Sequence, residues 1–331
     1  MSDTILVTGG AGYIGSHTSY ACLDAGHRVI VLDDLSTGAE HCVPAEAEFI
    51  RGSVEDRSLL QKLFRSEGIK AVFHFAGRII VPESVENPIK YYAENTAASL
   101  GLIAEMVAAE VPTILFSSTA AVYEPRPDGE PLGEDSPKAP LSPYGQSKLM
   151  TEAMIRDVGH AHGLQAGILR YFNVAGADPD GRTGQSGANA THLLKIASQV
   201  AVGARPYMEI YGEDYATPDG TCIRDYIHVS DLASAHVETY QHVVSAGGQV
   251  TMNCGYGRGS TVKEVIAAAE AVTGQTIDAR PAPRRAGDAP ILVSDTTRIR
   301  ETLPGWQPQH DSLEEMARTA IAWEKRLGTL N

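Results

Sequence analysis

The chain has 331 residues, enough for one large domain or two coupled domains, and its 43% hydrophobic and 21% charged residues are ordinary for a globular protein. The formal net charge of −14 argues against nucleic acid or an anionic membrane as a main partner, because both attract basic surfaces. The four cysteines are dispersed and form no Cys-x-x-Cys pair, so we expect neither disulfides nor a bound metal.

The segment MSDTILVTGG enters a strand pattern at once, without the features of a signal peptide. No apolar run approaches the ~20 residues that are needed to span a bilayer. We therefore expect a cytoplasmic protein that does not bind membranes.

Short apolar runs alternate with helical patterns in the first half of the chain. The apolar runs are residues 4–9, 28–33, 71–77, 113–118 and 166–176, and the helical patterns between them are 13–25, 56–67 and 89–109. Near-continuous apolar strands are typical of a sheet buried on both faces, and strands that alternate with helices form right-handed βαβ units. The pattern predicts an α/β fold with a Rossmann-type doubly wound parallel sheet.

Beyond Ala177 the chain becomes rich in Gly, Asp and Asn, with helices expected near 191–203, 231–246 and 260–274. We expect these segments to form a smaller, partly interleaved C-terminal α/β lobe that binds the substrate. The predicted division assigns residues 1–176 and a returning segment at about 221–254 to the Rossmann domain, and residues 177–220 and 255–331 to the lobe.

The segment LVTGGAGYIGSH places Gly9, Gly12 and Gly15 between the first strand and the first helix. Glycines there allow a tight turn, a close approach of the backbone to a pyrophosphate and close packing of helix on sheet. Asp33 ends the second strand, where a carboxylate binds ribose hydroxyls and repels a 2′-phosphate. These features predict NAD as the cofactor; the alternative for Asp33 is that it only caps the next turn.

Three motifs, TGGAGYIGSH, STAAVY and SPYGQSK, resemble the extended short-chain dehydrogenase/reductase family. In that family a Tyr-x-x-x-Lys pair begins a helix beside the nicotinamide, and a Ser or Thr ends a neighbouring strand; the matching residues here are Tyr144, Lys148 and Thr119. Positions i and i+4 share a helix face, so a lysine ammonium and a cationic nicotinamide would both favour tyrosinate and lower the pKa of Tyr144. The alternative is an ordinary helix start with a half-buried tyrosine and a solvated lysine.

The resemblance covers essentially the whole chain and is strongest to the nucleotide-sugar epimerases of that family. It rests on HFAG (74–77), YYAENTAAS (91–99), LRYFNVAGADPDG (169–181), RDYIHVSDLASAH (224–236) and APRRAGD (282–288). It implies an NAD-dependent inversion of C4 of a UDP-hexose through a 4-keto sugar, interconverting UDP-glucose and UDP-galactose, with Tyr144 as acid and base. It also implies a homodimer.

The resemblance further implies two sets of contacts. The cofactor-binding residues are Gly9, Gly12, Tyr13, Ile14, Gly15, Asp33, Ser53, Val54, Phe75, Ala76, Gly77, Asn95, Ser117, Tyr144, Lys148 and Tyr171. The substrate-binding residues are Thr119, Tyr144, Asn173, His192, Leu193, Tyr211, Arg224, Arg285 and Asp288. Arginines concentrated on a diphosphate would reconcile an acidic protein with an anionic substrate.

Four residues depart from the epimerase pattern or bear on specificity. Glu124 replaces a usual glycine, Ser53 a common aspartate and Ile79 a frequent lysine near the cofactor phosphates. Leu292 matches a position where a bulky tyrosine restricts N-acetylated sugars, so we expect that UDP-N-acetylhexosamines also enter; the alternative is a core residue.

Other functions stay open at this point. Epimerases of UDP-xylose, UDP-arabinose or UDP-glucuronate differ from this pattern in only a few pocket residues. A 4,6-dehydratase needs an Asp-Glu pair after the Ser or Thr, whereas Ala120 and Ala121 follow Thr119. A non-catalytic NAD-binding regulator would not need Thr119, Tyr144 and Lys148 together.

Overall fold

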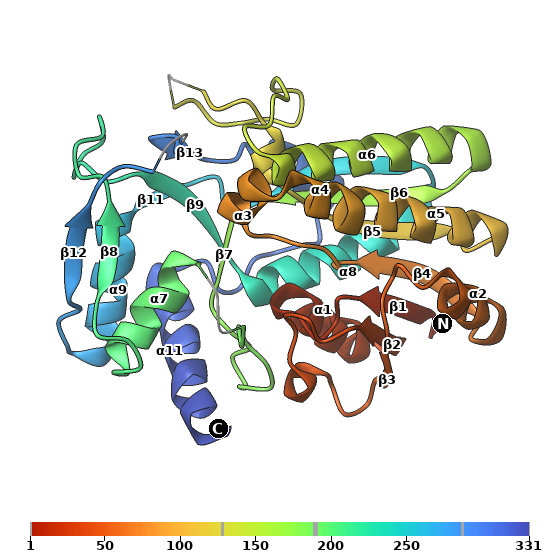
Figure 1. Ribbon diagram of the computed structural model, residues 1–331, viewed down its shortest axis with the longest axis horizontal. Coiled ribbons are helices and arrows are strands. Elements are labelled where there is room, and N and C mark those ends of the chain that lie inside the picture. Colours follow the sequence, from red (N-terminus) through yellow and green to blue (C-terminus); the bar gives the residue numbers. More distant parts are fainter. Residues whose placement is uncertain (1, 127–128, 188–190, 286–287, 331) are drawn as a thin grey trace.

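The computed structural model describes residues 2–126, 129–187, 191–285 and 288–330 (Figure 1). A seven-stranded parallel sheet, with strand order β10-β6-β5-β4-β1-β2-β3, forms its larger part. The strands are β1 (Thr4–Thr8), β2 (Arg28–Asp33), β3 (Glu48–Arg51), β4 (Ile69–His74), β5 (Thr113–Thr119), β6 (Gln165–Tyr171) and β10 (Gln249–Cys254). The strand order reverses between β1 and β4, as in doubly wound folds. The predicted fold class is confirmed.

Helices cover both faces of this sheet, which explains its near-continuous apolar strands. Alternate residues of a strand point to opposite faces: Ile5 and Val7 belong to one apolar cluster and Leu6 to another. The helices α1 (Tyr13–Asp24) and α8 (Val229–Ala246) pack together over the face of Ile5 and Val7. The other face carries α2 (Arg57–Ser66), α5 (Ala98–Ala108) and α6 (Pro143–His162) (Figure 1).

The smaller part is built around two short sheets and three helices that pack on one another. The first sheet joins β7 (Asn173–Ala175), β9 (Ile223–His228), β11 (Gly259–Thr261) and β13 (Ile291–Leu292), and the second joins β8 (Met208–Tyr211) and β12 (Ala279–Ala282). The helices are α7 (Leu193–Ala201), α9 (Val262–Thr273) and α11 (Leu313–Leu330). The chain thus enters the smaller part at β7 and builds α7, β8 and β9 there. It then returns to the large sheet with α8 and β10, and its remaining residues lead back to the smaller part. The domain limits given above stay a prediction.

Two elements differ from the expected ones. The helix expected over 89–109 is interrupted: α4 (Pro88–Tyr91) is followed by a π-helical segment, Tyr92–Ala97, before α5 begins. The strand expected over 166–176 is two strands, divided at Phe172. Before this residue the chain is β6 of the large sheet, and after it the chain forms β7, which pairs with β9 in the smaller part. Within the described ranges, no helix combines the length and apolar character needed to cross a membrane.

Candidate active site

The glycine turn lies between β1 and α1, and its close contacts explain its composition. Gly9 has φ +72°, and a Cβ there would lie 2.6 Å from the Ala76 amide nitrogen. A Cβ on Gly15 would lie 2.2 Å from the Gly9 carbonyl oxygen. Gly12 is the N-cap of α1 and has no side chain to occupy the first N–H groups of the helix. The turn therefore presents backbone donors and a positive helix end, which fits a pyrophosphate.

Asp33 lies beside this turn and is held by two backbone hydrogen bonds. Ala11 N donates to Asp33 Oδ2 at 3.0 Å, and Leu35 N donates to Oδ1 at 2.8 Å. Burial raises the pKa of Asp33, while these two bonds lower it. A carboxylate oxygen accepts more than one hydrogen bond, so Asp33 retains the capacity to bind ribose hydroxyls. The capping alternative and the ribose role are thus compatible.

Ser53 and Val54 follow β3 at the edge of the large sheet. The Ser53 hydroxyl accepts a hydrogen bond from Glu55 N at 3.1 Å, and Val54 is buried. Ser53 thus caps a local turn in the protein alone, and its contact with the cofactor stays a prediction.

The segment after β4 meets Asn95 on the π-helical turn. Asn95 Oδ1 accepts from Arg78 N at 2.7 Å, and its Nδ2 donates to Arg78 O at 3.0 Å and to Ser147 Oγ at 3.0 Å. A Cβ on Gly77 would lie 2.9 Å from Asn95 Oδ1. Asn95 therefore holds Gly77 and Arg78, just after β4, against Ser147 on α6. Single π turns of this kind are frequent at functional sites.

Tyr144 and Lys148 lie in the first two turns of α6, which is capped by Ser142. The Ser142 hydroxyl accepts from Gly145 N at 3.2 Å. Lys148 Nζ donates to Ser117 O at 2.9 Å, and Tyr144 forms a side-chain hydrogen bond with Thr119. Ser117 Oγ also bonds the Tyr171 hydroxyl. The structure thus brings the three predicted catalytic side chains together at the carboxyl end of β5.

Burial shifts the pKa values of both Tyr144 and Lys148. Burial raises the pKa of Tyr144, and the hydrogen bond with Thr119 lowers it by less. Burial lowers the pKa of Lys148 to about 8, while the charge of Glu152 raises it. In the protein alone, desolvation of the phenol thus outweighs the favourable contact. The lowering of the Tyr144 pKa that we expect from Lys148 together with a cationic nicotinamide stays a prediction.

Five of the predicted substrate residues, Asn173, Tyr211, Arg224, Arg285 and Asp288, lie on β7, β8, β9 and the segment before β13. Arg224 Nη2 donates to Asp288 Oδ1 at 2.5 Å, so two of these residues form an ion pair. The Arg285 guanidinium lies 3.8 Å from the ring centroid of Tyr211. Arg284 pairs instead with Asp214 at 2.6 Å and covers the Tyr215 ring. Of the two adjacent arginines, Arg284 is thus a surface ion-pair residue.

A second contact region joins the glycine turn to α7 and α11. Tyr13 OH donates to Gly176 O at 2.6 Å, and the ring of His192 meets the Tyr13 ring edge to face at 6.2 Å. His192 is the N-cap residue of α7 and precedes Leu193, and its Nδ1 lies 2.6 Å from Gln185 Nε2. Burial lowers the pKa of His192 to about 4, so its imidazole is neutral at pH 7. Asn173 begins β7.

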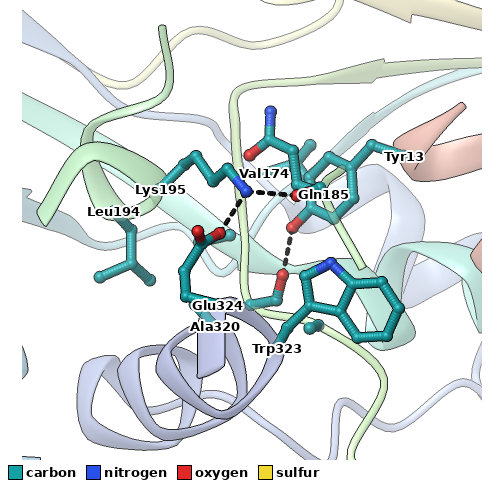
Figure 2. Close-up of a pocket in the computed structure, with 11 residues that line it drawn as sticks. Tyr13, Val174, Gln185, Leu194, Lys195, Ala320, Trp323 and Glu324 are labelled. Carbon is teal, nitrogen blue, oxygen red and sulfur yellow. Dashed lines mark hydrogen bonds and ion pairs between the residues drawn. The ribbon is translucent and has the colours of Figure 1, made fainter. Parts of the chain in front are cut away.

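Figure 2 shows the small cavity that this region encloses. Lys195 is buried there, and its ammonium pairs with the Glu324 carboxylate and donates to Gln185 O at 2.5 Å. The lining residues include Tyr13 but neither Tyr144 nor Lys148. The cavity is therefore separate from the acid–base group.

The residues that depart from the epimerase pattern occupy three different environments. Glu124 N donates to Pro137 O at 2.9 Å, which fixes the backbone of that loop without a glycine. Ile79 is 56% exposed. Leu292 packs against the apolar cluster of Ala120, Val122, Tyr123 and Leu132, so it lies next to the turn that follows Thr119.

Sequence reasoning missed a buried polar group behind the catalytic side chains, formed by Ser118, Glu152 and Arg170. One signal was present, because 144, 148 and 152 recur every fourth residue on one helix face. In the described ranges no cluster of three or more His, Cys, Asp or Glu side chains is arranged to hold a metal ion.

The sequence pattern of the NAD dependent epimerase/dehydratase family matches residues 5–255. The chain belongs to this NAD-dependent epimerase/dehydratase family. Within the family, the UDP-glucose 4-epimerase of Azospirillum brasilense is 53% identical over 326 residues, which are 98% of this chain and 93% of the relative.

Two solved structures of the family are similar over nearly their full length. The UDP-glucose 4-epimerase from Brucella ovis in complex with NAD is 40% identical, with a TM-score of 0.93 and coverage of 97% of this chain and 98% of that chain. The UDP-Glc/GlcNAc 4-epimerase from Campylobacter jejuni is 43% identical, with a TM-score of 0.85 and coverage of 98% and 100%. The sequence resemblance to epimerases of this family is confirmed.

Proposed function

We propose that this protein is an NAD-dependent isomerase that inverts C4 of a UDP-hexose and thereby interconverts UDP-glucose and UDP-galactose. The observation that carries the proposal is the convergence of Thr119, Tyr144 and Lys148 at the carboxyl end of β5, the same edge of the parallel sheet at which the glycine turn follows β1 and Asp33 ends β2. The names of the full-length relatives support the same reaction.

The cofactor would supply a hydride acceptor that is restored within each cycle, so no external oxidant is needed. Gly9, Gly12 and Gly15 would hold its pyrophosphate and Asp33 its adenosine ribose. Asn95 and Lys148 would position the other half of the cofactor, since Asn95 bonds Arg78 just after β4 and Lys148 bonds Ser117 near the end of β5.

Tyr144 is the proposed acid and base. Its phenolate oxygen would take the proton of the sugar 4-hydroxyl when that carbon is oxidised, and would return it when the carbonyl is reduced. Thr119, which already bonds Tyr144, would donate a hydrogen bond to the same sugar oxygen. Because burial raises the Tyr144 pKa in the protein alone, the positive charges of Lys148 and of the bound nicotinamide would together be needed to favour the phenolate.

Arg224 and Arg285 would bind the UDP diphosphate, with Tyr211 beside the base and Asp288 holding Arg224 in place. A firm grip on UDP and a loose grip on the sugar would let the keto sugar turn over before hydride returns. Asn173, His192 and Leu193 would complete the substrate side.

Substrate breadth depends on the surroundings of Leu292. Its side chain is smaller than the tyrosine expected in epimerases restricted to plain hexoses, which supports turnover of UDP-N-acetylhexosamines as well. The similarity to the UDP-Glc/GlcNAc 4-epimerase supports this breadth. A 4,6-dehydratase is disfavoured, because Ala120 and Ala121 begin the 3-10 turn after Thr119 and provide no acid–base pair.

The test is to incubate the purified protein, without added NAD, with UDP-glucose, UDP-N-acetylglucosamine, UDP-xylose and UDP-glucuronate and to identify the products. We expect UDP-galactose from UDP-glucose, and loss of activity in Tyr144→Phe with NAD retained. No product from UDP-glucose, or equal rates in both proteins, would refute the proposal. No turnover of UDP-N-acetylglucosamine beside good turnover of UDP-glucose would refute the assignment of Leu292.

We further propose a cytoplasmic homodimer. The helix layer of α3 (Val81–Glu86), α4, α5 and α6, together with the π-helical segment Tyr92–Ala97, carries six of the eleven large apolar side chains that are exposed in the described residues. These are Val81, Val85, Ile89, Leu100 and Met150, with Tyr92 on the π-helical segment. A second copy of the chain would cover this layer. All four cysteines are free thiols, which suits a reducing compartment.

A further inference from the structure

A buried ion pair lies directly behind the acid–base residues. Arg170 Nη2 donates to Glu152 Oε2 at 2.6 Å and Arg170 Nε donates to Oε1 at 2.9 Å, with 3% and 0% of the two side chains exposed. A buried ion pair contributes little net stability compared with apolar residues of similar volume. Stability alone therefore does not account for this pair.

Glu152 is connected to each element that carries a catalytic side chain. It lies on α6, one turn after Lys148 and two turns after Tyr144. Ser118 Oγ donates to Glu152 Oε1 at 2.5 Å. Ser118 stands between Ser117 and Thr119 on β5. The carbonyl oxygen of Ser117 accepts a hydrogen bond from the Lys148 ammonium at 2.9 Å. The Glu152 carboxylate therefore joins α6 to the end of β5.

Arg170 extends this connection to β6 and to the segment after Thr119. Arg170 Nη1 donates to Tyr123 OH at 3.0 Å and to Glu134 O at 3.1 Å. Tyr171, the next residue, bonds Ser117. All three guanidinium nitrogens of Arg170 are thus hydrogen-bonded, and they join Glu152 on α6 to Tyr123 and Glu134 in the segment that follows Thr119.

We propose that Glu152 is a positioning residue of the acid–base site, whose carboxylate fixes Lys148 and Thr119 relative to each other through Ser118 and Arg170. The inference deepens the proposed function and concerns the same site. Glu152 then has two effects. Its carboxylate fixes the position of the end of β5, and its negative charge lies one helical turn from Lys148.

The electrostatic part is specific to Glu152. Burial lowers the pKa of Lys148 to about 8, and the Glu152 carboxylate opposes this change. Removing the carboxylate charge must therefore lower the Lys148 pKa further, so that the ammonium is lost at a lower pH. Titratable and charged groups surround Lys148 and Glu152 on every side. They are Tyr144 and Arg156 on α6, His74 on β4, Arg170 and Tyr171 on β6, and Tyr123 and Lys138 in the segment between β5 and α6.

The experiment measures Lys148 directly, so it does not depend on turnover. Protein labelled with 15N-lysine is titrated by NMR, and the Lys148 Nζ signal is assigned with Lys148→Arg. We expect Glu152→Gln to lower the Lys148 titration midpoint by about one pH unit or more, and Glu152→Asp, which keeps the charge, to restore most of it. Folded Glu152→Gln protein with an unchanged midpoint would overturn the proposal.

Glu134→Gln is the matched control. Glu134 is also a buried carboxylate, and its Oε1 accepts from Asn253 N at 2.7 Å, but only its main-chain carbonyl meets Arg170. The control should leave the Lys148 midpoint unchanged; an equal shift in both variants would show a general effect of lost charge and would count against a role particular to Glu152.

A second variant keeps the proposal testable if Glu152→Gln does not fold. Ser118→Ala removes the bond between β5 and Glu152 without changing any charge. We expect kcat for UDP-glucose to fall about tenfold or more with KM nearly unchanged, because the catalytic hydroxyls lose their alignment. A wild-type kcat in Ser118→Ala would overturn the positioning role. Inactive wild-type protein would instead refute the proposed function and leave the NMR result to decide this inference.

Discussion

Gly9→Ala, compared with Gly26→Ala, tests whether the glycine turn is required by close contact with β4 or only by its backbone conformation. Both glycines have positive φ, +72° and +83°. A Cβ on Gly26 meets nothing within 4 Å, whereas a Cβ on Gly9 lies 2.6 Å from Ala76 N and 2.9 Å from Ala76 Cα. The two substitutions therefore share the conformational strain and differ in the steric clash.

The expected magnitudes follow from these contacts. A left-handed alanine costs roughly 1–2 kcal/mol, so Gly26→Ala should lower the free energy of unfolding by about that amount. Non-bonded carbon atoms rest about 3.5–4.0 Å apart, so Gly9→Ala must also push the Phe75–Ala76 backbone away by roughly 1 Å. Overpacking of this kind adds about 1–3 kcal/mol, for a total of roughly 2–5 kcal/mol.

Urea unfolding of the NAD-free proteins measures the stability difference, and the NAD content of each purified protein measures the effect on the cofactor site. We expect Gly26→Ala to retain wild-type NAD content and Gly9→Ala to lose most of it, since the displaced residues Phe75 and Ala76 border the predicted pyrophosphate site. Equal losses of stability in the two variants, with equal NAD content, would refute the steric reasoning.

Two further predictions concern pH and assembly. Burial lowers the pKa of His17, His192 and His236 to about 4 and that of His74 and His228 to about 3. As the pH falls, the unfolded chain, with histidine pKa values of ~6.5, binds protons before the folded protein does. The contribution of these histidines to the free energy of unfolding should therefore be constant above that pH and fall below it by up to about 1.4 kcal/mol per pH unit for each imidazole. Equal urea midpoints at pH 7 and pH 5 would contradict this prediction. Ile89→Asp, on the exposed apolar layer, should shift the sedimenting species from dimer to monomer. Val244→Asp, on α8 at the opposite face of the sheet, should leave the dimer unchanged. A wild-type protein that sediments as a monomer would rule out the homodimer.

Local patterns were enough to predict the features that depend on spacing along one element. The Tyr144 and Lys148 pair follows from the helical period, and Asp33 follows from the end of a buried strand beside a glycine turn. Both are found where the sequence placed them, on α6 and at the end of β2. Their contacts with cofactor and substrate stay predictions.

Features that depend on tertiary packing could not be predicted in the same way. Arg170 lies inside the apolar run AGILRYF, and only the fold shows that Glu152 from α6 neutralises it. The π-helical turn at Asn95 depends on hydrogen bonds to Arg78 and Ser147, which are distant in sequence. The raised pKa of Tyr144 depends on burial, which the motif alone does not specify.

The late return of β10 to the large sheet has a consequence for how the protein is made. β6 pairs with β10 on its outer side, yet more than seventy residues separate the two strands along the chain. These residues include all of α7, β8, β9 and α8. During synthesis, β6 is therefore an edge strand whose outer side is unpaired, and the face of Ile5 and Val7 lacks the cover of Val237 and Tyr240 from α8. Exposed strand edges and apolar faces promote aggregation. The nucleotide-binding half thus cannot mature on the ribosome before residue 254 has emerged.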